Sequence, residues 1–269
     1  MTHAIIKRSN PVSSDEEFDG FEKIMNANEL GDLYEQNQII DNSKNKIIIL
    51  GYHQIRKIKN TDSQKAKLFI TSPETFDKEM SYLHSNGYHS VPFSEYVDDF
   101  NSGNLKGIPE KSFIITFDDG YVSQYNEALP VLKKNNFSGT FFIYSYCVDK
   151  YPICLTSEEI KTLANNGMKI ANHTLHHVYL PEYGDELIKK EVNLNEEKLI
   201  SIVGTSSVEN VFAYPYGAND GRVRKIIKDL GYSGAVGVLP EKESTTTDIY
   251  NLRRYLLGND LDFFMSLFK

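Results

Sequence analysis

The sequence predicts an α/β fold, a distorted (β/α) barrel of about seven strands. Short apolar runs alternate along the chain with amphipathic segments of roughly 10–20 residues, a pattern typical of parallel βαβ units. The alternation begins at residue 46 and continues to the C-terminus without a linker-like segment. The composition is 40% hydrophobic and 12% aromatic, which is sufficient for the core of one folded domain.

Residues 1–45 differ from the rest of the chain. They contain nine acidic and four basic side chains, and their few apolar residues recur at helical spacing. We therefore expect an acidic N-terminal leader with short helices over 1–45 and one catalytic domain over 46–269. A free tail is the alternative for the leader.

Each expected element has a local signal. The run KIIILGYHQI at 46–55 is typical of a strand buried on both faces. A helix is expected over 72–88, where apolar residues recur at helical spacing and Gly87 can end the helix. Thr156 and Glu159 form a capping-box pattern at the start of another helix. The remaining strands are expected over 111–117, 138–146, 168–173, 211–217 and 232–238, and the remaining helices over 124–136, 155–167, 184–203 and 220–231.

Charge and hydropathy exclude some classes of partner and location. The formal net charge of −8 argues against nonspecific nucleic-acid binding, and we expect no nucleic-acid partner. No run of about 18 apolar residues is present, so we expect no transmembrane segment. The N-terminus lacks the apolar region of a signal peptide, which favours a cytoplasmic location; a truncated chain would show the same pattern, so an extracellular or cell-surface location stays open. Cys147 and Cys154 are expected to be buried thiols, with a disulfide as the alternative.

Two adjacent acids follow the strand expected over 111–117. Asp118 and Asp119 repel each other, and this arrangement is costly beside an apolar strand unless positive charge lies close by. In a parallel barrel the carboxyl ends of the strands form the rim where active sites occur. A simple Asp-Gly turn is the structural alternative.

A histidine cluster follows another expected strand and opens on the same rim. His173 and His177 are four residues apart, so one helical turn would direct both imidazoles at a single point. With a carboxylate from a neighbouring strand they make a His₂Asp set, which is typical of a catalytic metal site. His176 is expected to face elsewhere.

The segment YPYG at 214–217 also follows a strand. Rigid backbone around Pro215 can direct an N–H group at a developing oxyanion, whereas a tight turn with aromatic packing is the plainer interpretation.

Together these motifs resemble the polysaccharide deacetylases, the NodB-homology group also called carbohydrate esterase family 4. TFDDG, HTLHH and AYPYG are similar to three motifs of that family, and the resemblance extends over about 46–269. It implies that a divalent metal is held by Asp119, His173 and His177, most often Zn²⁺, with Co²⁺, Mn²⁺ or Ni²⁺ as alternatives. It also implies that Asp118 is the general base that activates water and that the Tyr216 backbone N–H stabilises the oxyanion.

The sequence departs from the family pattern in two places. The third motif lacks its usual arginine, and no histidine follows His177. The LGYHQI segment resembles a permuted subgroup that acts on poly-β-1,6-N-acetylglucosamine, in which an early histidine replaces the late one. The resemblance therefore implies that His53 is the general acid and that Arg254 orients Asp118, with a core histidine and a surface ion pair as the respective alternatives.

We therefore expect a metal-dependent N-deacetylase that acts on N-acetylhexosamine units, N-acetylglucosamine above all, of a polysaccharide and releases acetate. Its expected partner is an N-acetylated glycan, and the rim residues Tyr121, Tyr125 and Tyr216 could stack on sugar rings. Two alternatives stay open: a cytoplasmic deacetylase of a small N-acyl sugar, and a glycan-binding module that retains the metal site. The sequence leaves the glycan linkage and the oligomeric state open.

Overall fold

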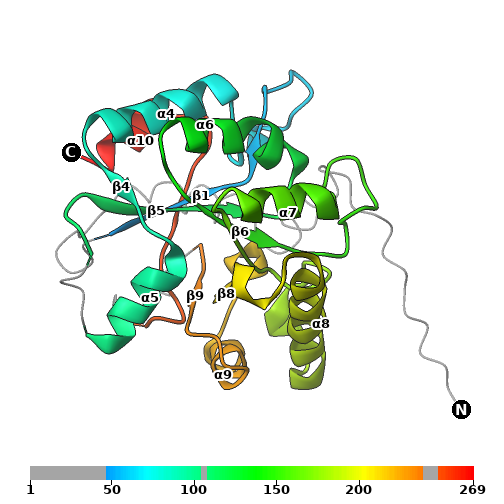
Figure 1. Cartoon of the computed structure of the whole chain (residues 1–269). Helices are drawn as coiled ribbons and strands as arrows, with labels where there is room; N and C mark the ends of the chain where they lie inside the picture. The colour runs from blue at the N-terminus through cyan, green and yellow to red at the C-terminus, as the bar shows by residue number, and fades with distance from the viewer. Residues whose placement is uncertain (1–46, 104–107, 239–247) are drawn as a thin grey trace, which may run out of the picture. The chain divides into compact units, whose positions relative to one another are not determined.

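A parallel sheet forms the centre of the molecule (Figure 1). The computed structural model describes residues 47–103, 108–238 and 248–269. The strand order is β10-β1-β5-β6-β7-β8-β9, with β4 beside β5, and a separate pair is formed by β2 and β3. The strands are β1 (Ile48–Tyr52), β2 (Gln54–Ile55), β3 (Ile70–Thr71), β4 (His89–Ser90), β5 (Ser112–Asp118), β6 (Thr140–Ile143), β7 (Lys169–Asn172), β8 (Val208–Ala213), β9 (Gly234–Val236) and β10 (Tyr255–Leu256).

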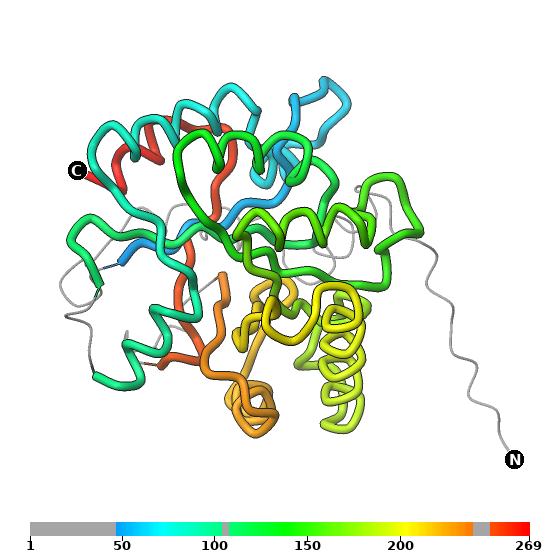
Figure 2. Tube along the Cα trace, viewed as in Figure 1, coloured from blue at the N-terminus to red at the C-terminus, as the bar shows by residue number. Residues whose placement is uncertain are grey.

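Helices connect the strands and cover the sheet (Figure 2). The predicted helices form where local signals place them, and the Thr156–Glu159 capping box is present. The helix expected over 124–136 begins as a π-helical turn, η2, and Pro130 lies in the first turn of α6, which follows η2 directly. The helices are α3 (Gln64–Lys67), α4 (Pro73–Ser85), α5 (Phe93–Ser102), η2 (Gln124–Ala128), α6 (Leu129–Lys134), α7 (Ser157–Asn165), α8 (Asp185–Val203), α9 (Gly221–Asp229) and α10 (Leu261–Ser266), with short 3₁₀ turns η3 (Leu180–Glu182), η4 (Thr205–Ser207) and η5 (Pro215–Gly217).

One C-terminal segment contacts both edges of the sheet. Leu252 pairs with Val236 of β9, and three residues later Tyr255 pairs in parallel with Leu50 of β1. The sheet therefore curls into a half-barrel rather than staying open. The predicted α/β fold with about seven parallel strands is confirmed.

The alternation along β5 decides which side chains reach the interior. Thr116 and Asp118 project into the barrel, where both contact a buried arginine. Phe117 points to the helical layer and packs against Phe76 of α4 and Phe141 of β6, with ring centroids 5.9 and 4.6 Å away. One face of β5 therefore packs against the helical layer, and its last carboxylate, that of Asp118, points into the barrel.

The division of the chain into 1–45 and 46–269 stays a prediction. The expected leader lies outside the described residues. Among the helices that the structure does describe, none is long and apolar enough to cross a membrane.

Candidate functional site

Asp118 lies at the carboxyl end of β5 in a two-point pair with Arg254. Arg254 Nη1 donates to Asp118 Oδ1 and Nη2 to Oδ2, each at 2.6 Å. The arginine is fully buried; it also donates hydrogen bonds to Thr116 Oγ1 and the Gly237 carbonyl, and its guanidinium lies over the Phe142 ring. Burial raises the pKa of Asp118, but the charges of Arg254 and His173 and the Arg254 hydrogen bonds outweigh it, so the pKa lies below its ordinary value. Asp118 is therefore an ionised carboxylate in a fixed orientation.

Asp119 faces a different point because the backbone turns sharply after Asp118. Its φ is 75°, and Gly120 follows with φ 68°. A Cβ on Gly120 would lie 2.9 Å from Ile143 Cγ2, so only glycine fits without a shift of β6. The left-handed turn lets two neighbouring carboxylates serve different parts of one site.

The histidine motif forms an irregular loop, so the helical turn expected over 173–177 is wrong. Thr174 and His177 both have positive φ, 63° and 54°, and the loop approaches α8 instead of coiling on itself. His173 Nδ1 lies 2.7 Å from the Ala213 carbonyl, a contact that makes Nδ1 the N–H donor and leaves Nε2 for a ligand. The two imidazoles converge through strained backbone, which is concentrated at functional sites in many proteins.

Asp119, His173 and His177 form a group that could hold a metal ion. One ligand atom from each lies within 4.8 Å of the others. Asp119 Oδ1 is 3.5 Å from His173 Nε2 and 3.3 Å from His177 Nε2. This oxygen is buried and has no hydrogen-bond partner among the described residues, as expected of an atom reserved for a metal. The N₂O donor set suits a catalytic divalent cation such as zinc.

The protonation of His177 also fits a metal ligand. Burial lowers the pKa of His177 to about 3, although Asp119 partly opposes the shift. The ring is therefore neutral at neutral pH, which is the form that coordinates a metal.

His53 follows β1 and faces Asp118. Its Nε2 is 3.9 Å from Asp118 Oδ2, and its Nδ1 has no hydrogen-bond partner in the part of the chain that the structure describes. Burial lowers the pKa of His53, and the charges of Asp119 and Asp118 only partly offset it. Gln124 fixes the two backbones to each other, because its Nε2 donates to the carbonyls of both His53 and Asp118.

Tyr216 lies beside the histidine loop. Its backbone has φ 59°, and its ring centroid is 4.5 Å from that of His177 and 6.3 Å from that of Tyr179. A Cβ on Gly217 would lie 2.6 Å from the Val238 backbone nitrogen, which explains the glycine after Tyr216. Tyr121, in contrast, is buried and bridges to Cys154, so it is not placed to stack on a sugar.

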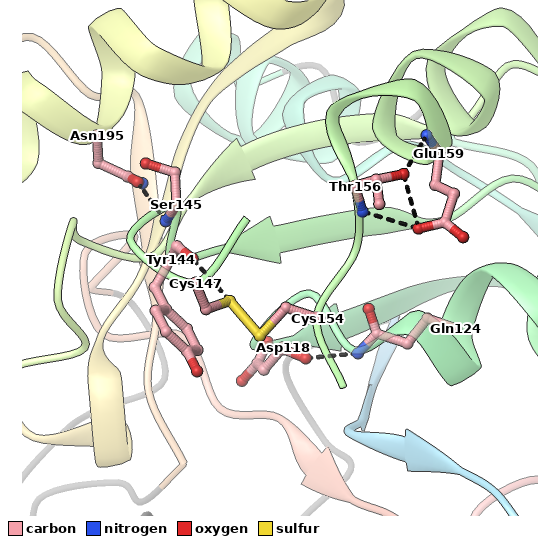
Figure 3. The surroundings of a disulfide bond; sticks show 9 residues. All are labelled: Asp118, Gln124, Tyr144, Ser145, Cys147, Cys154, Thr156, Glu159 and Asn195. Atoms are coloured by element: carbon pink, nitrogen blue, oxygen red, sulfur yellow. Dashed lines mark hydrogen bonds between the residues drawn. A yellow bond between two sulfur atoms is a disulfide. The ribbon is translucent and has the colours of Figure 1, made fainter. Parts of the chain in front are cut away.

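Cys147 and Cys154 form a disulfide, so the expectation of two free thiols is wrong (Figure 3). Both sulfurs are buried in the loop between β6 and α7. Leu155 N donates to the Gly120 carbonyl and Tyr146 N donates to the Leu175 carbonyl. The cross-linked loop therefore touches both the aspartate turn and the histidine loop.

Sequence reasoning missed the polar contacts that hold the histidine loop on α8. Asn172 Oδ1 accepts from Thr174 N and from Asn195 Nδ2, and Asn195 Oδ1 accepts from Ser145 N. Glu191 accepts from His176 N and lies 2.8 Å from His176 Nδ1, so His176 faces away from the ligands as expected. The available signal was Asn195 itself, a polar residue in line with the buried residues Ile188, Val192 and Leu199 of α8.

Comparison with known proteins gives the family. A family model described as polysaccharide deacetylase matches residues 106–235. YxkH of Bacillus subtilis, a protein assigned to the polysaccharide deacetylases, is 30% identical over 209 residues, which are 78% of this chain and 70% of YxkH. The poly-β-1,6-N-acetyl-D-glucosamine N-deacetylase of Staphylococcus aureus is 24% identical over 238 residues, with 81% of this chain and 80% of that protein covered.

Solved structures show the same fold. The Streptococcus pyogenes deacetylase PplD superposes with a TM-score of 0.72 at 22% identity, over 83% of this chain and 98% of PplD. The matching family model, the similarity to YxkH and the shared half-barrel agree with the three motifs that converge at the rim. The chain belongs to the polysaccharide deacetylase family.

Proposed function

We propose that the protein is a metal-dependent hydrolase that removes N-acetyl groups from N-acetylhexosamine units, most readily N-acetylglucosamine, of a polysaccharide. The observation that carries the proposal is Asp118, which is locked by Arg254 beside three converging metal-ligand atoms. The reaction adds water to the amide carbonyl and breaks the C–N bond, which gives acetate and a free amine.

The metal would be held by Asp119, His173 and His177, and Zn²⁺ suits this donor set best. When bound, such an ion supplies Lewis acidity, which lowers the pKa of water and polarises a carbonyl oxygen. Co²⁺, Mn²⁺ and Ni²⁺ are the alternatives to zinc.

Asp118 is the proposed general base. Its carboxylate accepts a proton from the attacking water at Oδ2, the oxygen that faces His53. Arg254 keeps both oxygens in place and fixes the direction in which the proton moves. Because the pKa of Asp118 is lowered by this arginine, the base is ready in its ionised form at neutral pH.

His53 is the proposed proton donor to the leaving nitrogen. Burial lowers the pKa of His53, so its imidazole is neutral in the resting site and can take up the proton from Asp118, 3.9 Å away. It then donates from Nε2 to the nitrogen as the C–N bond breaks. The Tyr216 backbone N–H is the proposed donor to the oxyanion, next to His177.

Turnover is favoured over a glycan-binding role by the residues around Asp118. The two motif residues that the sequence lacks are an arginine and a late histidine, and Arg254 and His53 stand beside the base in their place. This is tested by measuring acetate release from a panel of substrates: β-1,4 and β-1,6 N-acetylglucosamine oligomers and monomeric N-acetyl sugars. The wild type should release acetate. His53→Ala should lose acetate release and keep its metal. A wild type that binds glycans but releases no acetate from any sugar of the panel would support the binding module.

The compartment is a separate proposal. Disulfides persist mainly in oxidising compartments, so the Cys147–Cys154 bond favours the cell surface or exterior over the cytoplasm. Mass spectrometry of the protein alkylated in its native host tests this: a fully alkylated Cys147 would instead support the cytoplasmic location.

A further inference from the structure

The orientation of the His53 imidazole depends on the backbone that carries it. Nδ1 of the ring is buried and has no hydrogen-bond partner within the described ranges of the chain, and Nε2 is 3.9 Å from Asp118 Oδ2, beyond hydrogen-bonding distance. The Phe69 ring packs edge-on against the imidazole, with 4.9 Å between the ring centroids. A catalytic histidine is ordinarily oriented by a hydrogen bond to its second nitrogen. For His53 the direction of the ring must instead be set by the main chain.

The main chain at His53 lies just past the end of a strand ladder. The register between β1 and β5 ends at Tyr52 and Phe117. The next residues are His53 and Asp118, and both of their carbonyls accept from Gln124 Nε2, at 3.0 and 2.5 Å; Figure 3 shows the bond to Asp118. One side-chain amide therefore joins the two strands where their own pairing stops, and it ties the proposed acid to the proposed base.

The Gln124 amide is itself fixed. Its side chain is fully buried, and the two carbonyls must face its NH₂ group, because the amide oxygen cannot donate. Leu129 N bonds to the Gln124 carbonyl five residues earlier, the hydrogen bond of a π-helical turn, and such turns are frequent at functional sites. Ser123 Oγ accepts from Ile55 N at 3.2 Å, so the same segment also holds the chain that leaves His53.

Asp118 depends on Gln124 less than His53 does. Arg254 holds both carboxylate oxygens of Asp118 at 2.6 Å, and the pairing of β5 with β6 continues up to Asp118 and Phe142. Loss of the Gln124 amide should therefore leave the base in place and release the acid. Proton transfer requires His53 and Asp118 to approach each other, and a misplacement of about 1 Å can cost about 10²-fold in rate.

We propose that Gln124 is a positioning residue whose amide holds His53 against Asp118, so that the proton reaches the leaving nitrogen. The inference rests on the proposed deacetylase function and adds to it the residue that aligns the acid with the base. It also explains a glutamine at a fully buried position: an apolar side chain would fill the space at Gln124 but could not donate to two carbonyls.

Gln124→Met tests this with two acetyl compounds that differ in their leaving group. The amine of an N-acetylglucosamine oligomer leaves only after it gains a proton, whereas 4-nitrophenolate leaves from 4-nitrophenyl acetate without one. Gln124→Met should lower kcat for the oligomer about 10²-fold with KM unchanged, and should keep kcat/KM for the ester within about twofold of the wild type. Its metal content should equal that of the wild type, and His53→Ala should show the same selective loss.

Gln64→Met is the matched control, because it makes the same change at an exposed position of α3; both compounds should react as they do with the wild type. Equal losses on both compounds in Gln124→Met would show that the amide supports Asp118 or the fold as a whole, and would overturn the proposal. Full activity on both would overturn it too. If Gln124→Met does not fold, Gln124→Asn keeps the amide but withdraws it by one carbon–carbon bond, and it should show the same selective loss.

Failure of the deacetylase proposal is seen separately, as a wild type that releases no acetate from any N-acetyl sugar. The orientation of the imidazole is then measured without turnover, by NMR of the His53 ring, whose Cε1–H resonance is assigned by its loss in His53→Ala. In Gln124→Met this resonance should shift or broaden, because the ring is no longer held in one orientation. A resonance identical to that of the wild type would refute the positioning role.

Discussion

Asp118 and Arg254 form a buried ion pair with two hydrogen bonds. Both side chains are buried, and breaking such a pair leaves one charge without compensation. Arg254→Met should therefore lower the free energy of unfolding by about 3–5 kcal/mol, measured by urea denaturation. The double variant Asp118→Asn/Arg254→Met should lose much less free energy of unfolding than the sum of the losses in the two single variants, because neither charge of the pair is left buried. Additive losses would mean that the two residues are not coupled.

Glu79 is a buried carboxyl group outside the catalytic residues. It accepts from the Tyr52 hydroxyl at 2.9 Å, while its Oε1 has no partner among the described residues. Burial raises the pKa of Glu79 well above its usual range, with a smaller contribution from Asp260, although the Tyr52 hydrogen bond opposes the shift. The folded state therefore binds this proton more tightly than the unfolded state does.

The contribution of Glu79 to the stability of the fold depends on pH. A raised folded-state pKa stabilises the fold below the unfolded value of about 4.3, and this contribution is lost as the pH rises through the raised pKa. Glu79→Gln keeps the Tyr52 contact without the charge, so its Tm relative to wild type should rise between pH 5 and pH 8. Glu110→Gln, at an exposed position, is the control; a Tm difference for Glu79→Gln that does not change with pH would contradict the assignment.

Short motifs were enough to predict the residues that meet at the rim. Asp118 and Asp119 end one strand and the histidines follow another, and parallel strands bring their carboxyl ends to one edge. Spacing could not predict how His173 and His177 converge, because their loop depends on positive φ values set by contacts with α8. Arg254 was indicated by resemblance alone, since its partner lies 136 residues away in the chain.

The helix α8 positions the histidine loop through Asn195. This side chain is buried and joins Asn172 to the Ser145 backbone and the Ile143 carbonyl. Asn195→Leu should weaken metal affinity about 10–100-fold, the usual effect of losing an outer contact, while the helical circular dichroism is retained. Glu197→Leu, exposed on the same helix, is the control, and unchanged metal affinity in Asn195→Leu would show that the network only supports packing.

The disulfide loop between β6 and α7 should contribute both stability and site geometry. Cys147 and Cys154 are seven positions apart, and closing a loop of that length stabilises a fold by about 2–3 kcal/mol in the chain-entropy view. Cys147→Ala/Cys154→Ala should lower Tm and weaken metal binding, because the loop bonds to Gly120 and Leu175. Reduction of the disulfide in the wild type should have the same effect. A lower Tm with unchanged metal affinity would mean that the disulfide stabilises the fold but does not shape the metal site.

The curled sheet explains why the permuted arrangement of residues still makes one site. Residues 249–256 pair with β9 and with β1, so they close the gap between the first and last strands of the sheet. Arg254 enters the interior from this closing segment, and His53 enters from the end of β1 beside it. An arginine and a histidine from opposite ends of the chain thus reach Asp118 together. The alternation of strands and helices predicted the barrel, but the two-residue strand β10 is too short for its pattern to be recognised.

The separate roles of Asp118 and Asp119 are the central claim, and metal content measured together with acetate release tests it most directly. Purified wild type should bind about one divalent metal ion per chain and release acetate from N-acetylglucosamine oligomers. Asp118→Asn should keep the metal and lose at least 10²-fold in kcat/KM, in line with the usual contribution of general acid–base catalysis, whereas Asp119→Asn should lose the metal. An Asp118→Asn protein that retains both metal and activity would contradict the account.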